Sequence, residues 1–217
     1  MRWTHPVLGP IGPGEFIPLA EKTALIGPIT MRVLHAAVSQ VAAWQSQGLN
    51  VKVGINISAT DLESSAFVDE LAMLLERRRI NASSLELEFT ETALINKPQA
   101  VREQLDRIST LGIKIAIDDF GSGYSNWTYL RELPATTVKI DQTFMYELHT
   151  DEKNKPLVQA VIELASRLGY RVVAEGIEDA ATLELLQSWG CHAGQGYQIG
   201  RPMLPDRLVD WLAGRPS

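Results

Sequence analysis

The stretch IAIDDFGSGYS, residues 115–125, decides the fold that the sequence predicts. Apolar residues 115–117 run directly into Asp118 and Asp119, and Gly121 and Gly123 follow. A short apolar run of this kind is typical of a buried strand. Because adjacent strand residues face opposite sides, the two carboxylates can share one site only where the strand ends and the backbone turns. The two glycines permit such a turn. An Asx turn that caps the next helix is the alternative interpretation.

Outward from this stretch, short β-rich runs alternate with helix-like segments. The runs occupy 51–57, 85–89, 113–118, 136–140, 171–175 and 194–199, and the helix-like segments occupy about 67–79, 98–111, 156–168, 180–189 and 205–213, with a shorter one near 125–133. Before them, residues 4–14 suggest a loop, and apolar residues between Ile29 and Trp44 indicate a helix that Gly48 ends. The alternation predicts parallel βαβ units. A chain of 217 residues suits one large α/β domain.

The β-rich runs also share polar ends. The polar residues at these ends are Asn56, Glu88, Glu91, Asp118, Asp119, Lys139, Asp141, Glu175, Glu178 and Gln195. The carboxyl ends of parallel strands lie at one rim, where (β/α)₈ barrels build their active sites. Six units are counted, whereas a closed barrel of this kind needs eight.

Four of these side chains offer hard oxygen ligands: Asn56, Glu88, Asp118 and Asp119. Such ligands suit Mg²⁺ or Mn²⁺, whereas the scattered histidines and the single cysteine do not suggest zinc. Lys139 lies in a strand that is otherwise apolar or β-branched, where a lysine is costly unless it is paired or functional. It could hold a water or a phosphate, or form a Schiff base, and its acidic neighbours favour the charged role.

Composition limits the partners and the compartment. The formal net charge is −6 and no basic stripe occurs, so duplex nucleic acid is not expected as a partner. The single Cys191 fits a reducing compartment, and no apolar run approaches the length that spans a bilayer. We therefore expect a cytoplasmic protein without a membrane segment.

Several motifs together resemble the EAL-domain family, whose enzymes hydrolyse cyclic di-GMP to linear pGpG. They are RWTHP (2–6), FIPLAE (16–21), NIS (56–58), LEFTET (87–92), IAIDDFGSGYS (115–125), VKID (138–141), VVAEGIE (172–178) and QGYQIGRP (195–202). The resemblance implies a modified TIM (β/α) barrel, with residues 1–217 as a single domain. It also implies two Mg²⁺ or Mn²⁺ ions, a homodimer, and an upstream sensor or GGDEF-type domain.

The resemblance assigns roles position by position. Asn56, Glu88, Asp118 and Asp119 would be metal ligands. Lys139 would contact the hydrolytic water, Glu175 would be a ligand or base near it, and Glu91 would anchor the loop that follows the aspartate pair. The substrate would contact Arg2, Gln195 and Asp141.

One departure from the family concerns the signature Glu-Ala-Leu, which precedes the Arg-Trp pair. This chain begins at Met1 in that place, so we expect it to lack that glutamate and the first two strands of the barrel. An inactive module that binds cyclic di-GMP or a protein partner is therefore an alternative to a phosphodiesterase. Without the resemblance, Lys139 and the acidic rim would also suit an enolase-like or aldolase-like barrel.

Overall fold

A computed structural model describes residues 3–23, 25–90, 98–121 and 131–214. Their contacts divide the chain into two compact units. The first contains residues 1–117 and 126–135, and the second contains residues 118–125 and 136–217. The division falls inside one strand, β5 (Lys114–Phe120), between Ile117 and Asp118.

The first unit begins with a hairpin where the sequence suggested only a loop. Strands β1 (Trp3–His5) and β2 (Gly9–Ile11) pair antiparallel. The turn between them is held by His5, whose Nδ1 accepts hydrogen bonds of 3.1 Å from the backbone N–H groups of Val7 and Leu8. Helix α1 (Pro13–Glu21) follows and buries Phe16, which meets the ring of Trp3 edge to face. The loop prediction for 4–14 is therefore wrong for these elements, which are too short to leave a periodic pattern.

The rest of the first unit is built from helices around parallel strands. Its helices are α2 (Ile26–Ser46), α3 (Ala59–Leu62), α4 (Ser65–Arg78) and α5 (Pro98–Thr110), and its strands are β3 (Val53–Asn56), β4 (Leu85–Thr90) and the beginning of β5, with the 3-10 turn η1 (Ala82–Ser84) before β4. Strands β3 and β4 are parallel, and α2 packs against β3 and α4. The apolar face predicted for the first long helix is confirmed, because Leu34, Val41 and Trp44 are buried. The helix ends at Ser46, slightly before Gly48.

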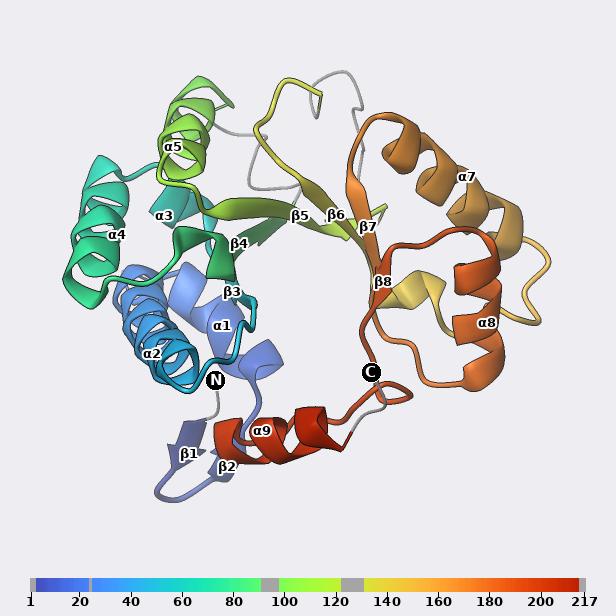
Figure 1. The fold of residues 1–217 in the computed structure, drawn as a ribbon, viewed down its shortest axis with the longest axis horizontal. Coiled ribbons are helices and arrows are strands. Elements are labelled where there is room, and N and C mark those ends of the chain that lie inside the picture. The colour runs from blue at the N-terminus through green and yellow to red at the C-terminus, as the bar shows by residue number, and fades with distance from the viewer. Residues whose placement is uncertain (1–2, 24, 91–97, 122–130, 215–217) are drawn as a thin grey trace. The chain divides into compact units, whose positions relative to one another are not determined.

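The second unit continues the alternation of strands and helices. It contains the end of β5, then β6 (Thr137–Ile140), β7 (Arg171–Ala174) and β8 (Ala193–Gly194), with the 3-10 turn η3 (Gln142–Phe144) and helices α7 (Asn154–Arg167), α8 (Ala180–Ser188) and α9 (Pro205–Ala213). Strand β7 pairs in parallel with β6 and with β8. Helices α7 and α8 lie on the same side of β7 and β8 (Figure 1).

The last strand is shorter than the sequence suggested. Residues 194–199 were predicted to be extended, but β8 stops at Gly194. The chain then turns back on itself, because the N–H groups of Ile199 and Gly200 both donate to the carbonyl of Gly196 at 3.0 Å. A side chain at Gly196 would lie 2.1 Å from the backbone oxygen of Ile177, so this close approach needs a glycine.

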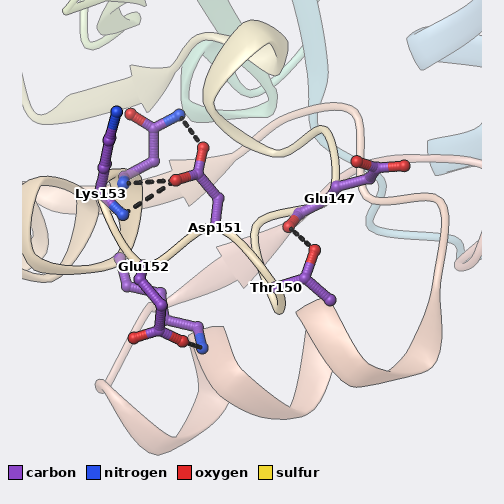
Figure 2. A network of polar contacts seen from close by, with 7 residues as sticks. Glu147, Thr150, Asp151, Glu152 and Lys153 are labelled. Carbon is purple, nitrogen blue, oxygen red and sulfur yellow. Dashed lines mark hydrogen bonds and ion pairs between the residues drawn. The ribbon is translucent and has the colours of Figure 1, made fainter.

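The loop between η3 and α7 is organised by one aspartate (Figure 2). The Oδ1 atom of Asp151 accepts hydrogen bonds from the backbone N–H groups of Lys153 at 2.9 Å and Asn154 at 3.1 Å, while its Oδ2 accepts one from the Asn154 side chain. These bonds satisfy N–H groups at the start of α7 that have no partner within the helix. The side chain of Asp151 thus has a local structural role.

Within each unit the strands neighbour one another in chain order, β3-β4-β5 in the first and β5-β6-β7-β8 in the second. The predicted alternation of strand and helix is confirmed by this order. The short helix expected near 125–133 lies largely outside the described residues. Among the described helices, none has the length and apolarity needed to cross a bilayer. A single domain over residues 1–217 stays a prediction.

Candidate functional site

Lys139 lies between two carboxylates in the second unit. Its Nζ atom is 3.1 Å from Asp118 Oδ1 and 2.6 Å from Glu175 Oε1, and the lysine is only 5% exposed. These three side chains come from the carboxyl ends of β5 and β6 and from the residue after β7. A buried ammonium requires such partners, so the pairing accounts for a lysine in an otherwise apolar strand.

The aspartate pair lies within β5, where the backbone is locally irregular. Asp119 itself has a φ of 52°, a left-handed conformation that is uncommon for a residue other than glycine. The strand continues to Phe120 and ends before Gly121, which also has a positive φ. A Cβ at Gly121 would lie 3.0 Å from the Phe144 ring. Gly123, the other glycine predicted to permit the turn, lies outside the described residues. The predicted consequence is present: Asp118, Asp119 and Glu175 each offer a carboxylate oxygen, and these atoms lie within 4.8 Å of one another.

Burial, hydrogen bonds and neighbouring charges shift the pKa values of three carboxyl groups of this site. Burial, the charge of Asp118 and a hydrogen bond with Asp141 raise the pKa of Asp119 to about 6. Burial also raises the pKa of Glu175, although Lys139 opposes this shift. Burial acts to raise the pKa of Asp141 as well, but hydrogen bonds with Thr143 and Asp119 outweigh it and hold that pKa below its usual range. The backbone N–H of Thr143 donates to Asp141 Oδ1 at 2.7 Å.

This set of donors fits a divalent cation. The Lys139 ammonium pairs with Asp118 and Glu175, and the pKa of Asp119 is raised first by burial and then by the charge of Asp118. A hard divalent cation would relieve the repulsion from Asp118, and carboxylate oxygens are the ligands that Mg²⁺ and Mn²⁺ prefer. The second unit thus contains a carboxylate cluster with the chemistry of a metal site.

Two further predicted ligands lie in the first unit, on neighbouring strands. Asn56 of β3 is the register partner of Glu88 of β4. The carboxylate of Glu88 is buried and lies over Gly54, where a Cβ would be only 2.0 Å from Glu88 Oε1. Gly54 therefore leaves the space that the carboxylate occupies. Glu86, on the same strand, has its Oε1 3.5 Å from the ammonium of Lys52, which accounts for its charge.

The remaining predicted site residues are Gln195, Arg2 and Glu91. Gln195 is exposed just after β8, and its backbone donates to Ala174 O at 2.8 Å and accepts from Ile177 N at 3.0 Å. Arg2 and Glu91 lie outside the described residues. The functional roles assigned to all of these residues stay predictions.

Sequence reasoning missed how the loop after Glu175 is held. Gly176 has a φ of 73°, and a Cβ there would lie 2.5 Å from Gln142 Cβ, in the turn that follows Asp141. It also missed the hydrogen bond between Asp119 and Asp141. The first could have been suspected, because Gly176 directly follows a carboxylate at the end of an apolar strand. The second had no signal in the sequence.

Comparisons with known proteins agree on one family. The profile of the EAL domain matches residues 1–202. The chain is 54% identical over 212 residues to the cyclic di-GMP phosphodiesterase PA2567 of Pseudomonas aeruginosa, covering 98% of this chain and 36% of that protein. It is 40% identical over 214 residues to the bifunctional diguanylate cyclase/cyclic di-GMP phosphodiesterase MucR of the same organism, covering 98% of this chain and 31% of MucR. The chain thus spans about a third of the length of these curated relatives.

Solved structures confirm the fold class. The MucR phosphodiesterase in complex with c-di-GMP matches with a TM-score of 0.90 at 40% identity, covering 95% of this chain and 84% of that one. The EAL enzyme Bd1971, with cAMP and cyclic di-GMP bound, matches with a TM-score of 0.91 at 31% identity, covering 97% of this chain and 58% of that one. The prediction of a modified TIM barrel is therefore confirmed. With matches of this extent in both sequence and structure, the chain belongs to the EAL-domain family.

Proposed function

We propose that this chain is a metal-dependent phosphodiesterase that hydrolyses cyclic di-GMP to linear pGpG. The observation that carries the proposal is the cluster of Asp118, Asp119 and Glu175 around Lys139, in a chain 54% identical to a cyclic di-GMP phosphodiesterase. An enolase-like or aldolase-like reaction has no comparable support, because these relatives act on a phosphodiester.

We assign the metal ligands to Asp118 and Asp119 in the second unit and to Asn56 and Glu88 in the first, with two Mg²⁺ or Mn²⁺ ions. When bound, such ions would polarise the phosphate and lower the pKa of an attacking water. The raised pKa of Asp119 supports this assignment, because burial, its largest cause, and the charge of Asp118 both disfavour a carboxylate without a nearby cation.

Lys139 would contact the attacking water, and Glu175 would act as the base that accepts its proton. Burial raises the pKa of Glu175, which brings a carboxylate closer to the pH at which a general base works well. The ammonium of Lys139, 2.6 Å from Glu175 Oε1, would orient that carboxylate and stabilise negative charge on a phosphate oxygen. Gln195, Asp141 and Arg2 would contact the substrate, and Glu91 would anchor the loop after the aspartate pair.

Turnover of cyclic di-GMP by the whole chain, with Mn²⁺ and with pGpG separated by chromatography, tests the proposal. Asp118→Asn should abolish turnover and leave the circular dichroism spectrum unchanged. Asp69→Asn is a matched control, because this exposed aspartate of α4 pairs with Arg107 and belongs to the first unit, whereas the cluster belongs to the second. Equal turnover in Asp118→Asn and wild type would remove the aspartate pair from the reaction.

A module that binds cyclic di-GMP without hydrolysing it is the alternative, and the same samples distinguish it. Saturable binding without pGpG, which survives chelation at least in part, would support a receptor rather than an enzyme. A cytoplasmic location, a homodimer, an upstream sensor or GGDEF-type domain and a single domain over 1–217 stay predictions of the sequence.

A further inference from the structure

Asp61 is a buried carboxylate that no part of the proposed reaction uses. It lies in α3 and is 3% exposed, and one of its oxygens, Oδ2, accepts three hydrogen bonds. The donors are Thr30 Oγ1 at 2.9 Å, the backbone N–H of Ser58 at 2.9 Å and Ser58 Oγ at 2.7 Å. In return, the N–H of Asp61 donates to Ser58 Oγ at 3.2 Å. All of these residues belong to the first unit.

These bonds join the segment after β3 to helix α2. Thr30 lies in α2, and Gly27, one turn earlier in that helix, places its backbone so that a Cβ would be 3.8 Å from the other oxygen of Asp61. Ser58 is the N-cap of α3. The carboxylate therefore faces α2 through both of its oxygens and ties α2 to the start of α3.

The joined segment begins two residues after Asn56. Asn56 is the last residue of β3 and pairs with Glu88, and the N–H of Ile57 donates to Glu88 O at 2.8 Å. Asn56 is thus paired with β4, and the backbone that follows it is held by β4 at Ile57 and by Asp61 at Ser58. Both restraints act on the short backbone stretch that begins at Asn56.

A buried charge is an expensive way to cap a helix of four residues. The N-cap of α3 is the neutral Ser58, and Asp61, three residues later, completes a capping box by accepting the backbone N–H of Ser58. The turn η1 is capped by the neutral Asn81 alone, whose Oδ1 accepts from Ser83 N at 3.0 Å and Ser83 Oγ at 2.8 Å. A fully bonded buried carboxylate gains rigidity, because several donors converge on one fixed atom. Such rigidity matters where a ligand must be held in one orientation.

We propose that Asp61, held by Thr30, is a positioning residue that fixes Asn56 as a metal ligand. The proposal rests on the proposed function in one respect, the assignment of Asn56 to the metal. Residues that orient a ligand in this way typically change metal affinity about 10-fold to 100-fold when they are altered. Thr30→Val removes one donor and keeps the side-chain volume, and Asp61→Ala removes the whole network.

The test is the binding of Mn²⁺ alone to the whole chain, followed by the loss of the free-ion electron paramagnetic resonance signal. We expect the dissociation constant to rise about 10-fold in Asp61→Ala and less in Thr30→Val. It should be unchanged in Thr30→Ser, which keeps the hydroxyl, and nearly restored in Asp61→Asn, whose amide oxygen can still accept. Asn81→Ala is the matched control: it should lower the melting temperature as the other cap losses do, but leave Mn²⁺ binding unchanged.

The possible outcomes distinguish a failure of this inference from a failure of the proposed function. If Asp61→Ala is folded and binds Mn²⁺ as the wild type does, Asp61 has only a structural role and the inference is wrong. Equal weakening in Asn81→Ala would also overturn it, because the effect would then follow from stability. A wild type that binds Mn²⁺ but leaves cyclic di-GMP intact would instead overturn the proposed function. The effect of Asp61→Ala on the dissociation constant for Mn²⁺ would still test the inference.

Discussion

The ammonium of Lys139 lies 2.6 Å from Oε1 of Glu175, closer than its 3.1 Å separation from Asp118 Oδ1. Lys139 Nζ is the only cation that the described residues place in contact with this cluster. Lys139 therefore compensates the buried charge of Asp118 and Glu175.

Lys139→Met should be strongly destabilising as well as inactive. Removing one partner of a buried ion pair costs about 3 to 5 kcal/mol, because the remaining charges are left without compensation. The free energy of unfolding, measured with urea in the absence of metal, should fall by about 3 kcal/mol. Adding Glu175→Gln to this variant should recover part of the loss, since one of the stranded charges is removed. If the double variant were as unstable as the sum of the two single variants, the pair would not be coupled.

The affinity for Mn²⁺ should depend on pH because of Asp119. Burial and the charge of Asp118 raise the pKa of this carboxyl to about 6, so below that pH a proton competes with the metal. We expect the affinity to increase as the pH rises from 5 to 7 and then to level off. In Asp119→Asn this part of the pH dependence should disappear. A wild-type affinity that is constant over the range would contradict the assignment of Asp119 to the metal.

The same shift predicts how metal-free stability changes with pH. The folded state binds the Asp119 proton more tightly than the unfolded state, whose carboxyl titrates near its usual pKa of about 4. The stabilising contribution is complete below about pH 4 and is lost as the pH rises through about 6. Urea unfolding at several pH values, with chelator present, should show a smaller loss over this interval in Asp119→Asn than in the wild type. Identical pH profiles for the two proteins would contradict the raised pKa.

Gly176→Ala should displace the loop that carries Glu175. The φ of 73° disfavours alanine, and the added Cβ would lie 2.5 Å from Gln142 Cβ. Backbone strain and overpacking each cost about 1 to 3 kcal/mol, so we expect a loss of about 3 kcal/mol in stability together with reduced turnover. Gly169→Ala is the matched control, because Gly169 has a φ of 89° and no atom within 4 Å of the added Cβ. The control should lose only about 1 kcal/mol and retain its turnover. Equal effects in both variants would show that contact with Gln142 is unimportant.

The sequence by itself determined the order of the elements and the chemistry of the strand ends. Apolar runs of four to six residues between amphipathic helices are local patterns, and they predicted the strands from β3 to β7 because neighbouring residues alone produce that periodicity. The position of Asn56, Glu88, Asp118 and Glu175 at strand ends was visible for the same reason. Short elements without periodicity, such as the hairpin of β1 and β2, were missed.

Only the tertiary structure decided which of these side chains meet. That Lys139 joins Asp118 to Glu175, and that Gly54 makes room for Glu88, depends on strand register and on packing between segments far apart in the chain. Thr30 reaches Asp61 across 31 residues for the same reason. The left-handed backbone of Asp119 is also set by its surroundings, because an aspartate has no strong local preference for that conformation. Local patterns reveal the residue types at the rim, but contacts between distant segments turn them into a site.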